Sequence, residues 1–189
     1  ITVQGARLGD ATVAANALLL NGLLLTAHAL DGLAHAVEAL CGHAIGARDR
    51  EALRRSLVVA CAWSLLASLG FAVLFLFAGH LFIEMQTDIQ SVRDTAFIYL
   101  PYLAALPLIA VGSYLLDGLF IGATRAREMR NGMLLTVILL LPFAWALQGF
   151  GNHGLWITFL LFMLLRSLTL GAFAWYLHKN DGWFAGKAH

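Results

Sequence analysis

Long apolar runs are the feature of this sequence that most constrains its fold. Five runs occur, at about 11–46, 57–78, 97–124, 133–148 and 155–177. An α-helix needs about 20 residues to cross the hydrocarbon core of a bilayer, and only the fourth run is a little short of that. Charged residues make up 12% of the chain, roughly half the share in soluble domains, which leaves too little polar surface to face water. We therefore predict an all-α polytopic membrane protein in which residues 1–189 form a single transmembrane domain with five helices.

Basic residues alternate between the connections and so predict an orientation. Arginines cluster between the first and second runs and between the third and fourth, whereas the connection between the fourth and fifth has no Lys or Arg. Basic connections mark the cytoplasmic side of a membrane. We therefore place the start of the chain outside and its end in the cytoplasm. The exterior start, the odd number of spans and the opening Ile1 in place of Met lead us to expect a piece of a longer protein.

An acidic residue lies inside the third run. Asp117 is eight residues before Arg125, or roughly 10 Å inside the cytoplasmic end of that helix. Inserting such a charge costs about 2.5–3.5 kcal/mol, and an aspartate is too short to reach the interface. Two interpretations stay open. Asp117 is either a proton, cation or substrate site or a neutral carboxyl that forms structural hydrogen bonds.

A polar stripe follows the first run. Positions 28, 31, 35 and 38 carry His28, Asp31, His35 and Glu38, and spacings of three and four place them on one helix face. We expect this stripe to face an aqueous cavity or another lobe of the protein. Asp31 lies near the middle of the run and is a candidate for transport chemistry, whereas Glu38 is close enough to the basic connection to be solvated or ion-paired.

Two pairs of glycines are each spaced four residues apart, and histidines and carboxylates recur at helical spacing. Gly42 and Gly46, and likewise Gly118 and Gly122, have the spacing of close helix contacts, although chance spacing explains them equally well. Histidines and carboxylates at helical spacing also occur in metal sites, so an intramembrane metal-dependent enzyme or a metal transporter is an alternative. No His-Glu-x-x-His or other catalytic motif is present. We expect no catalytic residue, metal or cofactor, and the net charge of +1 implies no nucleic-acid partner.

Three groups of motifs, in order along the chain, resemble the multidrug and toxic-compound extrusion (MATE) family and its DinF-like branch. The first group covers 16–21, 29–34, 37–39 and 42–48, the second 114–125 and 128–131, and the third 151–156. His28, His35 and His43 depart from the Tyr, Tyr and Gln that the resemblance leads us to expect. They leave open some sensitivity to pH.

The resemblance implies twelve helices in two six-helix lobes. This chain would hold helices eight to twelve and the end of helix seven, up to about Arg7, so that the N-terminal lobe is a missing partner. Members of the family are antiporters of bacterial-type inner (plasma) membranes and of comparable membranes. They export amphipathic, often cationic compounds in exchange for protons or sodium.

Asp117 falls where the family places a coupling carboxylate in its tenth helix. We expect Asp117 to exchange a proton, and Asp31, Tyr114, Glu38 and His35 to belong to the ion-coupling and substrate cavity. Tyr114, Phe120 and Phe97 would offer aromatic surface to a cation, although packing is an equally open role for each. A lipid-linked-intermediate flippase of similar architecture is a further alternative. It should have a strongly basic cavity, whereas the spans hold one internal arginine, Arg166.

Overall fold

The chain folds into a bundle of long α-helices. The computed structural model describes residues 9–180 and 182–184, and within them the all-α prediction is confirmed. The expected end of a preceding helix, up to Arg7, lies outside these residues. The helices are α2 (Asp10–Gly46), α3 (Arg50–Glu84), α4 (Gln90–Gly122), α5 (Ala126–Ala146) and α6 (Gly151–Lys179), with a 3₁₀ turn, η1 (Leu147–Phe150), between the last two.

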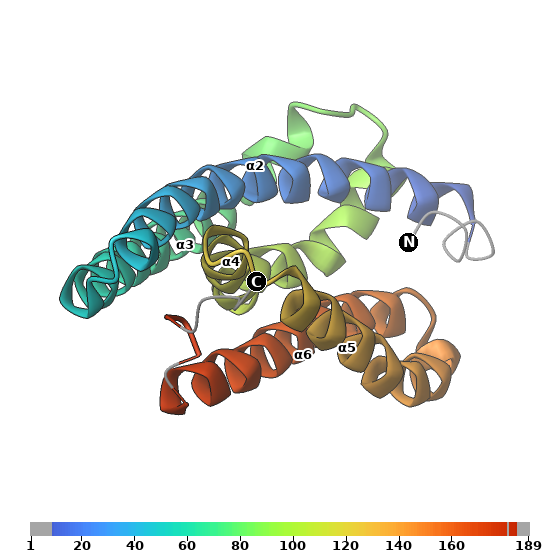
Figure 1. Cartoon of the computed structure of the whole chain (residues 1–189). Coiled ribbons are helices and arrows are strands. Elements are labelled where there is room, and N and C mark those ends of the chain that lie inside the picture. The colour runs from blue at the N-terminus through green and yellow to red at the C-terminus, as the bar shows by residue number, and fades with distance from the viewer. Residues whose placement is uncertain (1–8, 181, 185–189) are drawn as a thin grey trace.

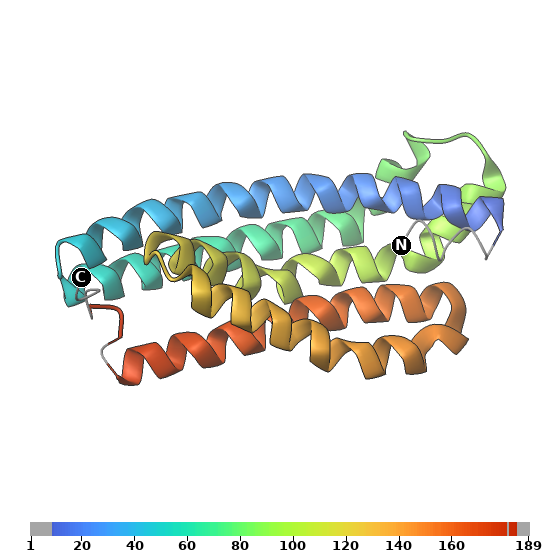
Figure 2. The ribbon, with the colours of Figure 1, turned by 45° about the vertical axis from the view of Figure 1, so that its right-hand side comes forward.

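Within residues 9–180 and 182–184, four stretches of helix are long and apolar enough to cross a membrane. They are α2, α3, α4 and the continuous stretch Ala126–Lys179. The last of these folds back on itself at η1, so that α5 and α6 form the hairpin seen in Figure 2. The reversal begins at Leu147, earlier than the connection that we expected at 149–154, and ends at Gly151, which adopts a φ of 57°. This left-handed conformation is one that glycine adopts without strain.

Helix α4 lies at the centre of the bundle. It packs against α2 and α3 on one side and against α6 on the other, and Figures 1 and 2 show the α5–α6 hairpin beside the group formed by α2, α3 and α4. Pro101 and Pro107 lie inside α4 and Pro142 lies inside α5. Proline within a membrane helix is tolerated where neighbouring groups satisfy the freed backbone.

A seam of glycines holds α2 against α4. A Cβ atom built on Gly118 would come within 3.0 Å of the Val37 Cβ atom and closer still to the carbonyl oxygen of Ala34. One built on Gly122 would press on the backbone of Glu38, and Gly42 faces Gly122 in turn. These four glycine and alanine positions, which we call the α2–α4 seam, let two backbones touch as in close membrane helix pairs. The second glycine pair of the sequence is therefore a true contact. Gly46, in contrast, has open space around it.

The two ends of the bundle are closed differently. At the beginning of α2 and α6, Asn16 and Asn152 exchange two buried hydrogen bonds of 2.7 and 3.1 Å, and the Trp156 indole donates to Asn16 at 3.0 Å. At the other end, Trp183 packs in a buried apolar cluster with residues of α2, α3, α4 and α6, and its ring lies 5.7 Å from that of Phe120. We call the hydrogen-bonded group of Asn16, Asn152 and Trp156 the polar lock, and the apolar cluster around Trp183 the apolar plug.

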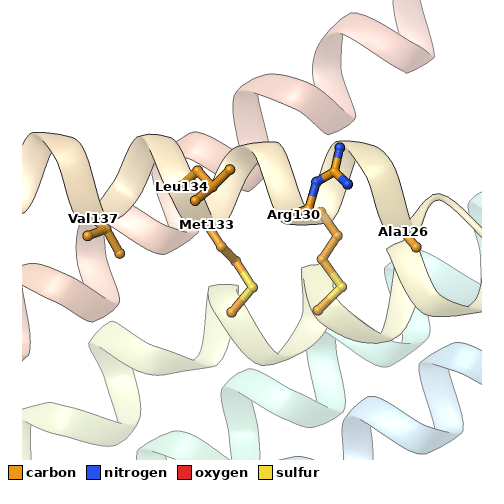
Figure 3. Close-up of a pocket in the computed structure, with 6 residues that line it drawn as sticks. Ala126, Arg130, Met133, Leu134 and Val137 are labelled. Atoms are coloured by element: carbon orange, nitrogen blue, oxygen red, sulfur yellow. The ribbon is translucent and has the colours of Figure 1, made fainter.

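The outer faces of the bundle are apolar. Many large apolar side chains of α3 and α5 are exposed, among them Leu66, Leu76, Phe77, Ile138, Leu141 and Trp145. A groove of about 300 Å³ runs along α5 past Met133. Figure 3 shows that Met133 and the Arg130 guanidinium leave α5 in opposite directions. Such surfaces suit the acyl chains of a bilayer.

Candidate functional site

An ion pair lies inside the bundle between α4 and α6. The Arg166 Nη2 atom donates a hydrogen bond of 2.5 Å to the Asp117 Oδ2 atom. Only 13% of the Asp117 side chain and 16% of the Arg166 side chain are exposed. An isolated charge at this depth is costly, and a direct partner of opposite charge offsets part of that cost. Asp117 therefore has a direct partner of opposite formal charge on α6, and the two side chains are buried together.

The pairing of Asp117 with Arg166 is absent from the expectations that the sequence supports. There, Arg166 is the single arginine within the spans and argues against a basic cavity. The signal was available, because Arg166 lies midway along α6 and is as expensive in a bilayer as Asp117. Two opposite charges buried in different spans are expected to pair. What the sequence does not contain is the adjacency of α4 and α6.

The ion pair is incompletely satisfied. Within the described residues, the second carboxylate oxygen of Asp117 (Oδ1) and the Nε atom of Arg166 are buried without a hydrogen-bond partner. A guanidinium has five N–H donors and a carboxylate accepts several hydrogen bonds, so both groups have capacity left over. Buried polar groups are usually satisfied, and unsatisfied ones at a charged site point to a group that binds there or to a change of partner.

Asp31 and Tyr114 lie within electrostatic reach of this pair. Tyr114 precedes Asp117 by one turn of α4, is half-buried, and interacts electrostatically with Asp31, Asp117 and Arg166. Asp31 also acts on Asp117. The α2–α4 seam brings them together, because Ala34 touches Gly118 one turn beyond Asp31 and one residue beyond Asp117. Asp31 is exposed, and within the described residues no hydrogen bond or ion pair to it is found.

The rest of the α2 stripe forms local contacts. The His35 Nδ1 atom lies 3.3 Å from the Glu38 Oε2 atom, with 78% of the His35 side chain and 38% of the Glu38 side chain exposed. The His28 Nδ1 atom contacts the carbonyl oxygen of Leu24 at 2.6 Å. No group of three or more His, Cys, Asp or Glu in the described parts of the chain is arranged to hold a metal ion. His35 and Glu38 thus extend the polar face beside Asp31.

Packing accounts for two of the three aromatic candidates. Phe120 is fully buried against Trp183, and the Phe97 ring stacks on that of His80 at 4.3 Å. Neither presents a free face at the ion pair. Tyr114 is the aromatic residue that remains beside the charges.

The charges at the site do not cancel. Asp31 and Asp117 contribute two negative charges, and Arg166 contributes one positive charge. With the Asp117–Arg166 pair neutral as a whole, the carboxylates of Asp31 and Glu38 leave this polar face with an excess of formal negative charge. Such an excess attracts cations. The apolar groove on α5 is lined by α5 residues alone and includes none of these groups.

Comparisons with known proteins agree with this picture of a membrane protein. The family model described as MatE matches residues 1–146. DNA damage-inducible protein F from Escherichia coli (strain K12) is 45% identical in an alignment of 190 positions, which covers 98% of this chain. The chain spans 40% of the length of that relative. The membrane-length helical stretches and the family match together show an integral membrane protein.

Proposed function

The chain belongs to the MatE family, as its motifs indicated, and from this premise we propose that it forms part of a secondary active antiporter. The full-length protein would export amphipathic, often cationic compounds in exchange for protons or sodium ions. The observation that carries this proposal is the buried Asp117–Arg166 pair, with Asp31 and Tyr114 in reach. Intramembrane ionisable residues mark ion and substrate pathways.

The exposed position of Asp31 supports a cavity between two lobes. Asp31, His35 and much of Glu38 lie on the surface of α2, although such groups are costly against lipid. A second lobe packed across this face would turn the surface into a water-filled cavity. Rocking of the two lobes would then open that cavity to each side of the membrane in turn.

Efflux from vesicles tests the proposed function. Full-length protein is reconstituted into liposomes loaded with tetraphenylphosphonium, a permanently monovalent apolar cation, and either a pH gradient or a sodium gradient is imposed. We expect gradient-driven movement of the cation against its own gradient, absent from protein-free liposomes. Equal leakage with and without protein under both gradients would refute the antiporter proposal.

We also propose that the two arginine-rich connections lie in the cytoplasm of a bacterial-type inner membrane. Single cysteines are introduced at position 128 and at position 152 in full-length protein that lacks Cys41 and Cys61. Intact cells are then treated with a membrane-impermeant maleimide. The cysteine at position 152 itself removes the hydrogen bonds between Asn16 and Asn152, and we expect labelling at 152 to exceed that at 128. Labelling at 128 alone would mean that the orientation is inverted.

A further inference from the structure

We propose that Arg166 is a tethered counter-cation that moves between Asp117 and Asp31 and thereby couples proton binding to the release of a substrate cation. The inference rests on the proposed antiport function and deepens it. Three observations carry it: Arg166 holds Asp117 by one hydrogen bond, its Nε donor is buried without a partner in the described residues, and the α2–α4 seam holds Asp31 close enough to Asp117 to interact with it electrostatically.

We assign the arrangement in the structure to the deprotonated half of the exchange. The Asp117 carboxylate is occupied by Arg166, which leaves Asp31 as the carboxylate available to a substrate cation. The fixed guanidinium also occupies the place beside Asp117 that a sodium ion would otherwise take. Because the guanidinium is covalently attached, it competes with free cations for a nearby carboxylate at a high effective concentration, within the short distance that its side chain can span.

A proton changes this arrangement without any imbalance of charge. When a proton adds to the Asp117 carboxylate, that group becomes neutral and no longer holds the Arg166 cation. The guanidinium then moves to Asp31, the remaining carboxylate, and displaces the bound substrate cation. Loss of the proton to the cytoplasm returns Arg166 to Asp117 and frees Asp31. Each cycle exchanges one proton for one monovalent cation.

The surroundings leave few other groups to carry the proton. On α4 the neighbour is Tyr114, and on α6 it is Arg166 itself. On α2, Asp31 shares its face with three ionisable residues: His28, His35 and Glu38. Between Arg55 and Glu84, α3 contains only Cys61 and His80 as ionisable groups, and α5 has none after Arg130. The histidines of α2 are therefore the competing source of a pH response.

Equilibrium binding of tetraphenylphosphonium to the full-length protein, at pH 6 and pH 8, tests the inference. For the wild type we expect binding about tenfold or more tighter at pH 8, the size of effect that about 1.4 kcal/mol produces. Arg166→Gln should bind tightly at both pH values, because no tethered cation remains to displace the probe. Asp117→Asn should bind weakly at both, because Arg166 is then always released to Asp31.

The double variant separates this inference from a structural role for the pair. Asp117→Asn combined with Arg166→Gln removes the released cation, so we expect it to regain tight binding that no longer depends on pH. A merely structural pair predicts binding no better than that of Asp117→Asn alone. Arg166→Lys, which keeps the charge, should keep a pH response. His35→Gln should keep it too.

The outcomes distinguish the two proposals. A wild type that neither binds nor exports the probe would refute the antiporter itself. A wild type that exports the probe, together with an Arg166→Gln variant that keeps the normal pH response, would overturn only the role of Arg166. Loss of the pH response in His35→Gln would also overturn it. If both Arg166→Gln and the double variant fail to give a monodisperse protein on size exclusion, the pair is structural and the inference is wrong.

Discussion

Replacing Asp117 with asparagine is expected to abolish gradient-driven efflux while leaving the protein folded. Asparagine keeps the size of the side chain, and its amide oxygen can still accept a hydrogen bond from Arg166, but it carries no charge and cannot take up or release a proton. Efflux of tetraphenylphosphonium from reconstituted liposomes, measured from pH 6 to pH 8, should fall to the level of protein-free vesicles. The efflux rate should thus fall roughly tenfold or more, which corresponds to a loss of at least about 1.4 kcal/mol in the free energy of coupling.

The matched control for this variant is Glu38→Gln. It makes the same chemical change on a side chain that is 38% exposed and whose carboxylate lies 3.3 Å from the His35 ring, so we expect a clearly smaller loss of efflux. Asp117 is merely structural if its asparagine variant retains wild-type efflux with wild-type pH dependence. The coupling site would then lie elsewhere in the full-length protein.

Replacing Gly118 with alanine is expected to destabilise the bundle by about 3 kcal/mol, at the upper end of the usual cost of overpacking. The added methyl group meets the backbone of Ala34 and the Cβ atom of Val37. Neither is a flexible side-chain end that can rotate away, so α2 and α4 must move apart. The loss of stability is measured as a lower temperature of thermal unfolding in detergent, with size exclusion used to monitor the fraction of folded protein. The separation of Asp31 from Asp117 should also reduce transport.

Gly70→Ala provides the control for Gly118→Ala. Gly70 lies inside α3, and a Cβ atom there meets nothing within 4 Å. We expect this variant to be neutral or slightly stabilised, because alanine favours helix more than glycine does. Equal thermal stability of the Gly118→Ala and Gly70→Ala variants would show that the α2–α4 seam does not hold the helices together.

The sequence predicted the helices because their cause is local. Uninterrupted apolar length is stable in a bilayer, so each apolar run lies almost wholly within one helix, although α3, α4 and α5 begin well before their runs. The turn between α5 and α6 was harder to predict. Gly151, Asn152 and Gly154 are typical of a loop, yet all three begin α6. Asn152 is helical because its amide pairs with that of Asn16, far away in the sequence.

The candidate site likewise has one part that can be predicted from the sequence and one part that cannot. The depth of Asp117 and the common face of Asp31 and His35 follow from position along one helix, and the sequence contains that information. The pairing of Asp117 with Arg166 depends on which helices are neighbours. Similarly, the packing of Phe120 depends on a tryptophan that returns from beyond α6. Contacts between elements are what the pattern along a chain does not encode.

The polar lock and the apolar plug have an optical consequence. Trp156 and Trp183 are buried at opposite ends of the bundle, whereas Trp63, Trp145 and Trp175 are largely exposed on its outer faces. The protein therefore carries an intrinsic fluorophore at each end. In variants in which Trp156 or Trp183 is the sole tryptophan, quenching by acrylamide would report whether water reaches that end. The emission of Trp156 would follow separation of α2 from α6, and that of Trp183 would follow release of the segment after α6. Opening of the two ends of the bundle could thus be timed independently without an added dye.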